Sequence, residues 1–491
     1  MKISQLLHEL DLNTRLDAST LEVDIQGIAD NSKDVEEGFA FVAIAGFESD
    51  GHSYIDQALE KGAALVIGEQ AITGLTVPYL QVENSRKALG RMARNFYGHP
   101  SSRKMMIGIT GTNGKTTTSY MLQHLLESSG KTCSVIGTIQ NIINGEKSKS
   151  SNTTPSALAL HKLLSLSRDE VVIMEVSSHG LSQYRLEGIE LDYCLFTNLH
   201  HEHLDYHETM EDYFQAKLLM FKQLKPNGKS IVNADNFWGQ KLTGILQSEE
   251  IAVYTIGESV ECNFKILQLD SQNSIAVIEE NGEIRTIVSP MSGIHNVYNT
   301  LMAYATSRLL GISAETLIHS TYRFKGVEGR FEVSKLANGS TVVVDYAHTP
   351  DAISYCLKTA RLQGAQRIIH IFGFRGDRDA SKRKAMLTVA AELSDRYILT
   401  FDDLNTVSEK EMADVLKQLN EDYGNPKGKI ITDRTLAINK AITESEPGDW
   451  IIITGKGHEK YQQPYELPAS TDRETIEFVS NQLKKVNQEY R

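Results

Sequence analysis

The chain has 491 residues, a formal net charge of −13, 41% hydrophobic residues and 23% charged residues. This length predicts more than one domain, and the apolar content suffices for buried cores, which excludes a mainly disordered chain. The acidic balance argues against a nucleic-acid partner, because phosphate backbones attract basic surfaces.

The cysteines and the N-terminal segment bear on where the protein works. The 4 cysteines are far apart and no pair has the spacing of metal ligands, so we interpret them as reduced thiols. The N-terminus lacks the basic start and apolar stretch of a secretion signal, and no run approaches the roughly 18 apolar residues of a membrane span. We therefore expect a cytoplasmic protein without membrane insertion. A monomer is also expected.

An N-terminal domain is predicted over residues 1–98. Two apolar runs, 39–46 and 63–69, have the length of buried strands, and residues 53–62 between them are typical of a helix. Residues 95–102 contain glycine and proline and are interpreted as a linker.

A central domain is predicted over residues 99–330. Apolar strands alternate with helices in its first part, which predicts a parallel sheet covered on both faces, as in P-loop ATPases. In its later part, residues 251–290 contain short runs that look like antiparallel strands, so we expect a small antiparallel sheet there. The predicted strands of the first part are residues 105–110, 171–176, 193–199 and 230–234.

A C-terminal domain is predicted over residues 331–491. Strong strand candidates separated by helical segments predict a second parallel sheet of the Rossmann-like type. These candidates are residues 341–347, 367–373, 396–402 and 450–456. The expected fold class is therefore α/β, arranged in three domains.

The strongest local signal is a glycine-rich loop at residues 108–116, between a predicted strand and a predicted helix. Its glycines let backbone N–H groups approach phosphates, and the helix N-terminus adds a positive dipole. Lys115 would reach terminal phosphates, and the Thr116 hydroxyl would bind Mg²⁺. The alternative is a glycine-rich turn with a chance lysine, since Ile109 occupies the first glycine position of the usual pattern. The predicted nucleotide-binding residues are Gly111, Thr112, Asn113, Gly114, Lys115, Thr116 and Thr117.

Acidic and histidine side chains follow the next strands. Glu175 ends a strand at the edge where open α/β sheets bind ligands, and a carboxylate there can hold Mg²⁺ against a nucleotide. His200, His201 and His203 lie close together, but neither a cysteine nor a second cluster of suitable spacing accompanies them, so we do not expect a zinc site. A solvated polar loop is the alternative interpretation of His200 and His201.

The loop at residues 110–116 and the segment EVSSHGLSQYR at residues 175–185 resemble the Mur ligase family. The second segment is typical of the branch that adds the third amino acid of the muramyl peptide, and the resemblance extends over almost the whole chain. It implies a three-domain enzyme that phosphorylates a carboxylate with ATP and lets an amine displace the phosphate.

The resemblance also implies a catalytic set, namely Lys115, Glu175, His203, Lys217 and Arg330. Two Mg²⁺ ions would be bound by Thr116, Glu175, His203 and Lys217. Lys217 would serve only as N6-carboxylysine, because a carbamate turns the cation into an anion. An ordinary surface lysine is the alternative. The family usually has an aspartate before the metal-binding histidine, and this chain has Glu202 there.

Two stretches resemble the family's binding segments for the UDP-muramyl peptide. The first lies in the N-terminal region, where Asn31 and Lys33 depart from the usual Asp-Ser-Arg, and the second is the loop at residues 152–155. The residues implied for this substrate are Ser32, Asp50, His52, Thr153, Thr154, Ser177 and Arg185.

Further ATP contacts are implied near the boundary of the third domain. Asn296 and Asn299 resemble the adenine-contacting segment, and the guanidinium fork of Arg330 suits phosphate once the third domain has closed. Asp345 ends a strand where it could bind ribose hydroxyls, and His348 is close by. A turn residue is the alternative interpretation of His348.

The incoming amino acid would be held by Arg378 at its α-carboxylate and by Asp402, Asp403, Asn405, Gly455 and Glu459. Two specificity signals disagree: Gly455 and Glu459 resemble diaminopimelate-adding enzymes, but those have an arginine where this chain has Asn405. The carboxylates of Asp402, Asp403 and Glu459 predict an acidic pocket that favours lysine, ornithine or diaminopimelate. Arg375 replaces a glycine usual in the family and receives no predicted role.

The function implied is the ATP-dependent addition of an amino acid to UDP-N-acetylmuramoyl-L-alanyl-D-glutamate, through an acyl phosphate, in peptidoglycan synthesis. A paralogue that uses the same chemistry on another amino acid or peptide is one alternative, and Asn405 is the residue that supports it. A non-catalytic nucleotide-sugar-binding protein is the other, although pure binding would not need the metal-binding set.

Overall fold

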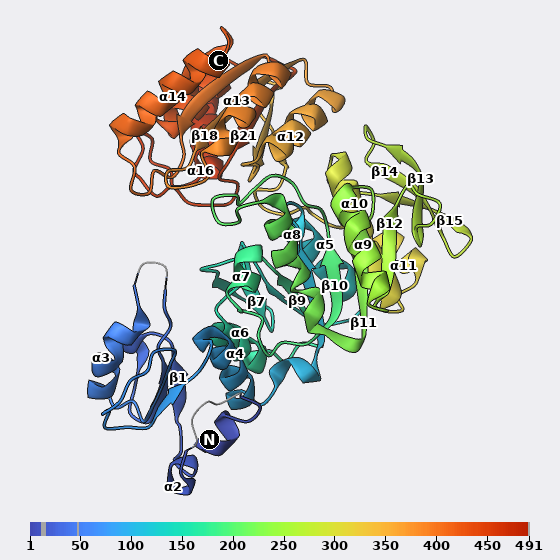
Figure 1. Cartoon of the computed structure of the whole chain (residues 1–491). Helices are drawn as coiled ribbons and strands as arrows, with labels where there is room; N and C mark the ends of the chain where they lie inside the picture. The colour runs from blue at the N-terminus through green and yellow to red at the C-terminus, as the bar shows by residue number, and fades with distance from the viewer. Residues whose placement is uncertain (11–15, 47–48, 490–491) are drawn as a thin grey trace.

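The computed structural model describes residues 1–10, 16–46 and 49–489. Its strands form three separate sheets, one in each of the three parts of the chain (Figure 1). In this view the C-terminal part lies above the central part, and the N-terminal sheet lies below and to one side. The α/β fold class in three domains is confirmed, and the domain limits at residues 98 and 330 stay predictions.

The N-terminal sheet has four parallel strands in the order β1-β2-β3-β4. The helix expected within residues 53–62 is present and ends before Gly62, whose φ of 92° needs a residue without a Cβ. The elements are α1 (Ile3–Leu6), α2 (Ala18–Leu21), β1 (Gly27–Ala29), β2 (Phe39–Val42), α3 (Ile55–Glu60), β3 (Leu65–Gly68), β4 (Tyr79–Gln81) and α4 (Ser85–Phe96).

The central sheet has 11 strands in the order β15-β14-β13-β12-β11-β10-β5-β9-β6-β7-β8. Its middle, from β13 to β6, is parallel, and antiparallel hairpins extend it at both ends. The strands are β5 (Met105–Thr110), β6 (Cys133–Ile136), β7 (Gln140–Ile143), β8 (Glu146–Lys149), β9 (Val171–Glu175), β10 (Leu191–Phe196), β11 (Leu224–Asn233), β12 (Ala252–Gly257), β13 (Phe264–Asp270), β14 (Ile275–Glu280) and β15 (Glu283–Val288). The helices are α5 (Lys115–Glu127), α6 (Ala157–Leu166), α7 (Ser178–Ser182), α8 (Met210–Leu218), α9 (Phe237–Ser248), α10 (Ile294–Leu309) and α11 (Ala314–Thr321).

The segment 251–290 differs in one respect from the expectation of antiparallel strands. Its first strand, β12, pairs in parallel with β11, because helix α9 carries the chain back across the sheet between them. β13 pairs in parallel with β12, whereas the pairs β13–β14 and β14–β15 are antiparallel as expected. All of these strands continue the central sheet instead of forming a separate one.

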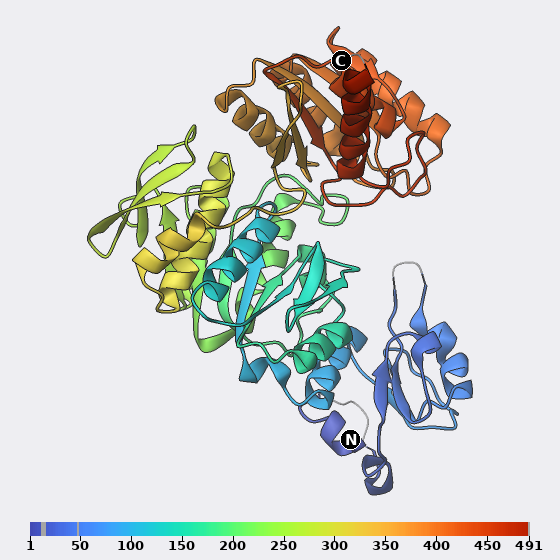
Figure 2. The same ribbon diagram turned by 180° about the vertical axis from the view of Figure 1, so that it is seen from behind.

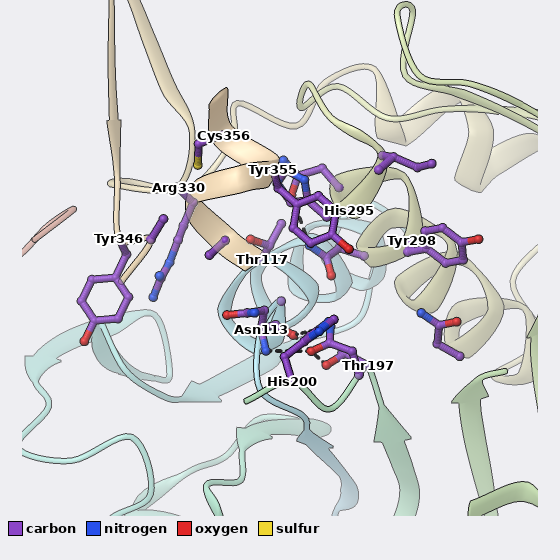
Figure 3. A pocket seen from close by; sticks show the side chains of 18 of the residues that line it. Asn113, Thr117, Thr197, His200, His295, Tyr298, Arg330, Tyr346, Tyr355 and Cys356 are labelled. Carbon is purple, nitrogen blue, oxygen red and sulfur yellow. Dashed lines mark hydrogen bonds between the residues drawn. The ribbon is translucent and has the colours of Figure 1, made fainter. Parts of the chain in front are cut away.

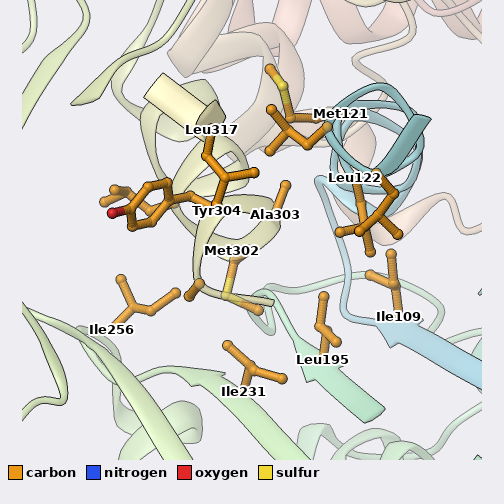
Figure 4. Packing of buried hydrophobic residues seen from close by; sticks show 14 of the residues in the cluster. Ile109, Met121, Leu122, Leu195, Ile231, Ile256, Met302, Ala303, Tyr304 and Leu317 are labelled. Carbon is orange, nitrogen blue, oxygen red and sulfur yellow. The ribbon is translucent and has the colours of Figure 1, made fainter. Parts of the chain in front are cut away.

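Helices α5 and α10 pack on one face of the central sheet and on each other. Buried side chains from both helices interlock with the strands, as Leu122 and Met302 do with Ile109, Leu195 and Ile231 (Figure 4). All five are at most 1% exposed. This packing fixes the start of α5, which follows the glycine-rich loop, against α10, which carries Asn296 and Asn299.

The C-terminal sheet has 6 strands in the order β16-β17-β21-β18-β19-β20, and only the pair β16–β17 is antiparallel. Helices α12, α13 and α14 cover one face, and α15 and α16 cover the other, as seen from behind in Figure 2. The strands are β16 (Glu332–Lys335), β17 (Thr341–Asp345), β18 (Arg367–Phe374), β19 (Arg396–Phe401), β20 (Gly428–Ile430) and β21 (Asp449–Thr454). The helices are α12 (Pro350–Leu362), α13 (Ser381–Leu393), α14 (Glu409–Tyr423), α15 (Arg434–Thr443) and α16 (Asp472–Glu489).

Among the described residues, no helix combines the length and the apolar character needed to cross a membrane.

Candidate active site

The glycine-rich loop connects β5 to α5, as its sequence predicts. Gly111 and Gly114 have φ values of 144° and 89°, which favour glycine. A Cβ at Gly111 would collide with the Thr197 hydroxyl, and one at Gly114 would collide with the Asn299 side chain. The loop therefore needs glycine both for its backbone conformation and for its close contact with neighbouring elements.

The amine of Lys115 is held inside this loop. Its Nζ donates to the carbonyl oxygens of Gly111 at 2.8 Å and of Thr112 at 2.9 Å. Burial lowers the pKa of this amine, while the nearby carboxylates of Glu175 and Glu202 oppose the shift. The side chain lies at the N-terminus of α5, where a phosphate would also meet the helix dipole.

Glu175 connects residues from three distant parts of the sequence. It is fully buried at the end of β9, where it accepts hydrogen bonds from the hydroxyls of Thr116 and Thr138, both at 2.8 Å. Arg330 in turn donates to the Thr116 hydroxyl at 3.2 Å, and its guanidinium lies 4.3 Å from the ring centre of Tyr346. The structure thus brings together Thr116, Glu175 and Arg330, as expected from the sequence.

A cavity of about 410 Å³ opens beside the loop, between the central and C-terminal domains (Figure 3). Predicted ATP-binding residues line it, namely Asn113, Gly114, Thr117, Asn296, Asn299, Arg330, Asp345 and His348. Sequence reasoning missed further lining residues, including Thr197, Asn198, Asn233, Asp235, Asn236, His295, Tyr298 and Tyr355. Several of these follow β10 and β11 directly, so polar residues after a strand were a usable signal.

Asp345 and His348 hold the turn that borders this cavity. Both carboxylate oxygens of Asp345 accept backbone N–H groups, from Ala347 and from Phe331, each at 2.6 Å. His348 contacts the Tyr346 carbonyl oxygen through Nδ1 at 2.8 Å, and its Nε2 lies 2.7 Å from Glu202 of the central domain. His348 is therefore a contact between domains as well as a turn residue.

A second cavity, of about 320 Å³, lies on the other side of Tyr346 and His348, which line both cavities. The predicted residues that line it are Thr153, Ser177, Arg185, His203, Arg378 and Asp402. Arg185 donates to the Thr154 carbonyl oxygen at 2.6 Å, and the Thr154 hydroxyl donates to the backbone carbonyl oxygen of Glu175 at 3.0 Å. The two loops that carry the implied muramyl-peptide contacts are therefore joined to each other.

Lys217 is buried on α8 and is 2% exposed, which excludes the alternative of a surface lysine. Its Nζ donates to the Gly111 carbonyl oxygen at 3.0 Å and lies 4.5 Å from the ring centre of Tyr213. Burial, together with the charge of Lys115, holds the pKa of Lys217 well below its usual range. Lys217 thus lies at the glycine-rich loop with an amine that favours the neutral form.

His203 and Glu202 lie where the central domain meets the C-terminal domain. Burial lowers the pKa of His203 to about 4, so its imidazole is neutral at pH 7 and can act as a metal ligand. Burial alone would raise the pKa of Glu202, but His203, His348 and Lys382 hold it well below its usual range. His200 lies 3.5 Å from Asp351 of the C-terminal domain.

The residue types fit Mg²⁺ held together with a nucleotide better than zinc held by protein alone. Within residues 1–10, 16–46 and 49–489, no group of three or more His, Cys, Asp or Glu side chains could hold a metal ion. Mg²⁺ is usually bound by one or two carboxylates plus substrate phosphates. Thr116, Glu175 and His203 offer a hydroxyl, a buried carboxylate and a neutral imidazole near the loop.

The predicted N-terminal residues lie in a different part of the molecule and line neither cavity. The Ser32 hydroxyl donates to Gln57 at 2.6 Å. Asp50 Oδ1 lies 2.6 Å from His52 Nδ1, and His52 Nε2 accepts the backbone N–H of Glu69 at 2.9 Å. These side chains shape the loops at the carboxyl edge of the N-terminal sheet, and their binding role stays a prediction.

The expected acidic pocket is wrong in its charge. Asp402 and Asp403 are buried, and Lys456 forms an ion pair with Asp403 and lies 3.7 Å from Asp402. Arg375 forms an ion pair with Glu459 and lies 3.6 Å from Asp402. Each of the three carboxylates therefore lies beside a cation from another loop. These pairings depend on the fold and cannot be read from the local sequence around 402 and 459.

Asn405 joins two loops of the C-terminal domain. Its Nδ2 donates to the Gly376 carbonyl oxygen at 2.6 Å, so its side chain is engaged within the domain. Its φ of 52° lies in the left-handed region, which asparagine tolerates better than most residues. Asn405 is not among the residues that line the second cavity.

Comparison with known proteins agrees with this arrangement. The chain matches three family descriptions: Mur ligase family, catalytic domain, at residues 24–97; Mur ligase middle domain, at residues 109–307; and Mur ligase, glutamate ligase domain, at residues 329–457. The chain belongs to the Mur ligase family, which confirms the resemblance stated from its motifs.

Curated relatives match along nearly their whole length. A UDP-N-acetylmuramoyl-L-alanyl-D-glutamate--2,6-diaminopimelate ligase of Clostridium tetani is 35% identical, over 98% of this chain and 100% of that protein. A protein of the same name from Aquifex aeolicus is 39% identical, over 91% of this chain and 92% of that protein.

Solved structures of related ligases share the fold. A UDP-N-acetylmuramoyl-L-alanyl-D-glutamate--2,6-diaminopimelate ligase superposes with a TM-score of 0.68 at 26% identity, covering 98% of this chain and 99% of that one. MurF of Thermotoga maritima in complex with ADP has a TM-score of 0.65 at 21% identity, covering 93% and 98%, which shows the fold alone.

Proposed function

We propose that this chain is an ATP-dependent ligase that joins an amino acid to UDP-N-acetylmuramoyl-L-alanyl-D-glutamate in peptidoglycan synthesis. The observation that carries this proposal is the pair of cavities that meet at Tyr346 and His348. One lies beside the phosphate loop, and the other combines residues implied for the muramyl peptide with Arg378, implied for the amino acid. Relatives at 35% and 39% identity carry the name of this activity.

ATP occupies the first cavity in this proposal, with its phosphates on the loop. Backbone N–H groups at the start of α5 and the amine of Lys115 bind the phosphates, and Arg330 reaches them from the boundary of the C-terminal domain. Thr116, Glu175 and His203 hold Mg²⁺, which when bound supplies positive charge beside the phosphates. These groups stabilise the charge that develops on the transferring phosphoryl group.

The bond changes take place where the two cavities meet. The terminal carboxylate of the muramyl dipeptide attacks the γ-phosphorus of ATP, ADP leaves, and an acyl phosphate forms. The neutral amine of the amino acid attacks the acyl carbon and loses a proton as the amide forms, and inorganic phosphate leaves. Arg185 and Ser177 position the peptide and Arg378 the amino acid, so much of the rate enhancement comes from orientation.

Lys217 carries a carbamate in this proposal. An amine combines with CO₂ only in its neutral form, and burial beside Lys115 favours that form. The product, N6-carboxylysine, is an anion at the loop and suits a second Mg²⁺, whereas a protonated lysine would repel it.

The UDP end of the substrate is assigned to the N-terminal domain, at Ser32, Asp50 and His52. In Figure 1 the N-terminal sheet lies apart from the C-terminal part, which carries Arg378, and this separation suits a long substrate that has its nucleotide at one end and its peptide at the other. The need for ATP supports a cytoplasmic location, and we propose that the protein acts as a monomer.

Phosphate release tests the proposal directly. The protein is incubated with ATP, Mg²⁺ and UDP-muramyl dipeptide, and each amino acid is added singly while phosphate and peptide product are measured. Release that requires both the dipeptide and an amino acid is the expected result. Release with a different peptide acceptor only would identify a paralogue of other specificity, and no release with any combination would favour a binding protein.

A further inference from the structure

Four arginines line the second cavity, and two of them, Arg375 and Arg378, lie on the same loop and each retain hydrogen-bonding capacity. Arg378 makes no hydrogen bond or ion pair with any residue that the structure describes. Arg375 uses its Nη2 atom, which donates to Glu459 and, at 3.1 Å, to the Gly455 carbonyl oxygen. A guanidinium has five N–H donors in a rigid fork that matches a carboxylate, so each arginine can bind one.

Arg375 has an unused donor in a buried position. Its Nε is shielded from solvent and has no hydrogen-bond partner among the described residues, and Asp402 Oδ1 lies beyond hydrogen-bond reach at 3.6 Å. No hydrogen bond within the described part of the chain uses its Nη1. A buried donor without a partner is costly, which points to a ligand acceptor at this place.

The position of Arg375 is fixed by its surroundings. Its guanidinium lies 5.5 Å from the ring centre of Tyr346, whose hydroxyl donates to Glu459 at 3.1 Å. Glu459 therefore contacts both side chains and keeps the arginine at the wall of the cavity. The same carboxylate is 28% exposed, so it can still accept a hydrogen bond from a ligand ammonium.

We propose that Arg375 binds a second carboxylate of the incoming amino acid, and that Glu459 accepts the ammonium beside that carboxylate. This inference rests on the proposed function, in which Arg378 binds the α-carboxylate. The site then takes a diamino dicarboxylic acid, with an amino-acid group at each end, in preference to a diamino acid with one carboxylate. A diamino acid with one carboxylate would bring an ammonium close to the cation of Arg375. It would bring no distal carboxylate for Arg375 to bind.

Asn405 is not the selecting residue in this arrangement. Its amide is engaged with the Gly376 carbonyl oxygen, next to Arg375 in the chain, and the backbone N–H of Gly376 donates to the backbone carbonyl oxygen of Asp403 at 2.9 Å. The loop that carries Arg375 and the loop that carries Asn405 are thus joined. The guanidinium comes from the first loop, and Asn405 holds that loop in place.

Three amino acids that differ by one group at a time test the assignment. Meso-diaminopimelate has both distal groups, L-lysine lacks the distal carboxylate, and L-2-aminopimelate lacks the distal ammonium. kcat/KM is measured for each with ATP and UDP-muramyl dipeptide. The full chain is expected to prefer meso-diaminopimelate over L-lysine on the order of 10- to 100-fold, the range of one charge-assisted hydrogen-bonded pair.

Substitution of Arg375 separates recognition from folding. Arg375→Ala is expected to lower kcat/KM for meso-diaminopimelate and L-2-aminopimelate by on the order of 10- to 100-fold, mainly through KM. Its kcat/KM for L-lysine should stay within about threefold of the wild-type value. Arg375→Lys keeps the charge but loses the fork, so it should restore part of the loss. Glu459→Gln should affect meso-diaminopimelate more than L-2-aminopimelate. Arg361→Ala, an exposed arginine on α12 paired with Asp395, is the matched control.

The outcomes distinguish this inference from the proposed function. If no amino acid supports phosphate release with wild-type protein, the proposed function fails. If ligation proceeds but Arg375→Ala lowers kcat/KM equally for all three amino acids, the assignment of Arg375 is overturned. A wild-type preference for L-lysine would overturn it as well. Should Arg375→Ala be unfolded by circular dichroism, the Arg375→Lys series decides, because equal loss for all three substrates there has the same meaning.

Discussion

Lys115 donates to two carbonyl oxygens of the glycine-rich loop, and its neighbours Asn113 and Gly114 line the first cavity. We expect Lys115→Ala to abolish ATP turnover, because no other described lysine reaches the loop except Lys217, which is buried behind it. ADP formation with all substrates present is the measurement. Lys131→Ala, just after the same helix and paired with Glu170 at the surface, is the control. Normal turnover in a folded Lys115→Ala variant would show that the phosphate-loop assignment is wrong.

Lys217 places a second amine at the same loop, where a protonated form is disfavoured. We expect Lys217→Ala to abolish ligation and excess bicarbonate to leave the variant inactive, because no amine remains to combine with CO₂. Phosphate release with and without bicarbonate measures this, and Lys241→Ala, a surface lysine paired with Glu211, is the control. Rescue by bicarbonate, or an unmodified wild-type lysine in a crystal structure at neutral pH, would contradict the carbamate.

At the level of residues, the sequence predicts groups that act where their own motif places them. Lys115, Glu175 and Arg330 belong to motifs with strong local constraints, and the structure brings them to one place. The charge of the amino-acid site was predicted wrongly, because it depends on pairs such as Lys456 with Asp403 that form only when distant loops meet. A count of nearby carboxylates cannot show which of them are already neutralised.

At the level of elements, apolar runs located the strands of both large parallel sheets, but not their complete order. The strand candidates at 105–110, 171–176 and 341–347 coincide with β5, β9 and β17. The direction of β12 was missed because pairing depends on the connection before it. Helix α9 makes β12 parallel, whereas the turn between β13 and β14 makes those strands antiparallel. Apolar runs alone do not distinguish these connections.

Gly114 offers a test of how α5 and α10 form the nucleotide cavity. It has a φ of 89°, and Gly130, beyond the end of α5, has a φ of 85°, so alanine is strained at both positions. Only at Gly114 would the new Cβ meet Asn299, because the position at Gly130 is open. Gly114→Ala is expected to lower kcat/KM for ATP on the order of 100-fold through displacement of the loop.

Gly130→Ala is the matched control, since it shares the backbone strain and lacks the collision. It should lose about 1 kcal/mol of stability and keep its kcat/KM for ATP. The two variants are compared by thermal unfolding and by steady-state kinetics with varied ATP. Equal kinetic losses in both would assign the effect to α5 as a whole and not to the contact with Asn299.

At the scale of the whole molecule, a few polar contacts hold the C-terminal domain against the central domain. Glu202 approaches both His348 and Lys382, and Arg330 donates to the Thr116 hydroxyl. All of these residues lie at or beside the two cavities. Several of the groups that join the domains therefore lie beside the proposed substrate sites, so substrate binding and domain closure are expected to favour each other.

Buried histidines give the whole molecule a predictable response to acid. Burial lowers the pKa of His161 to about 4 and that of His370 to about 3, in the central and C-terminal domains respectively. In the unfolded chain histidine titrates near pH 6.5, so the unfolded state binds more protons as the pH falls below that value. The free energy of unfolding therefore keeps its full value above about pH 6.5. It falls as the pH drops toward 4 or 3, because in that range only the unfolded chain takes up these protons.

We expect acidification from pH 7.5 to 5 to lower the free energy of unfolding by about 2 kcal/mol for each such histidine. His370 is fully buried on β18, where Nε2 lies 2.9 Å from the Thr454 hydroxyl and its ring stacks on Phe372. His370→Gln removes the titrating group, so the variant should lose about 2 kcal/mol less than the wild type over this range. Urea unfolding at both pH values measures the difference, with exposed His8→Gln as the control. Identical pH dependence of wild type and His370→Gln would mean that His370 is protonated in the folded protein without cost, against its burial.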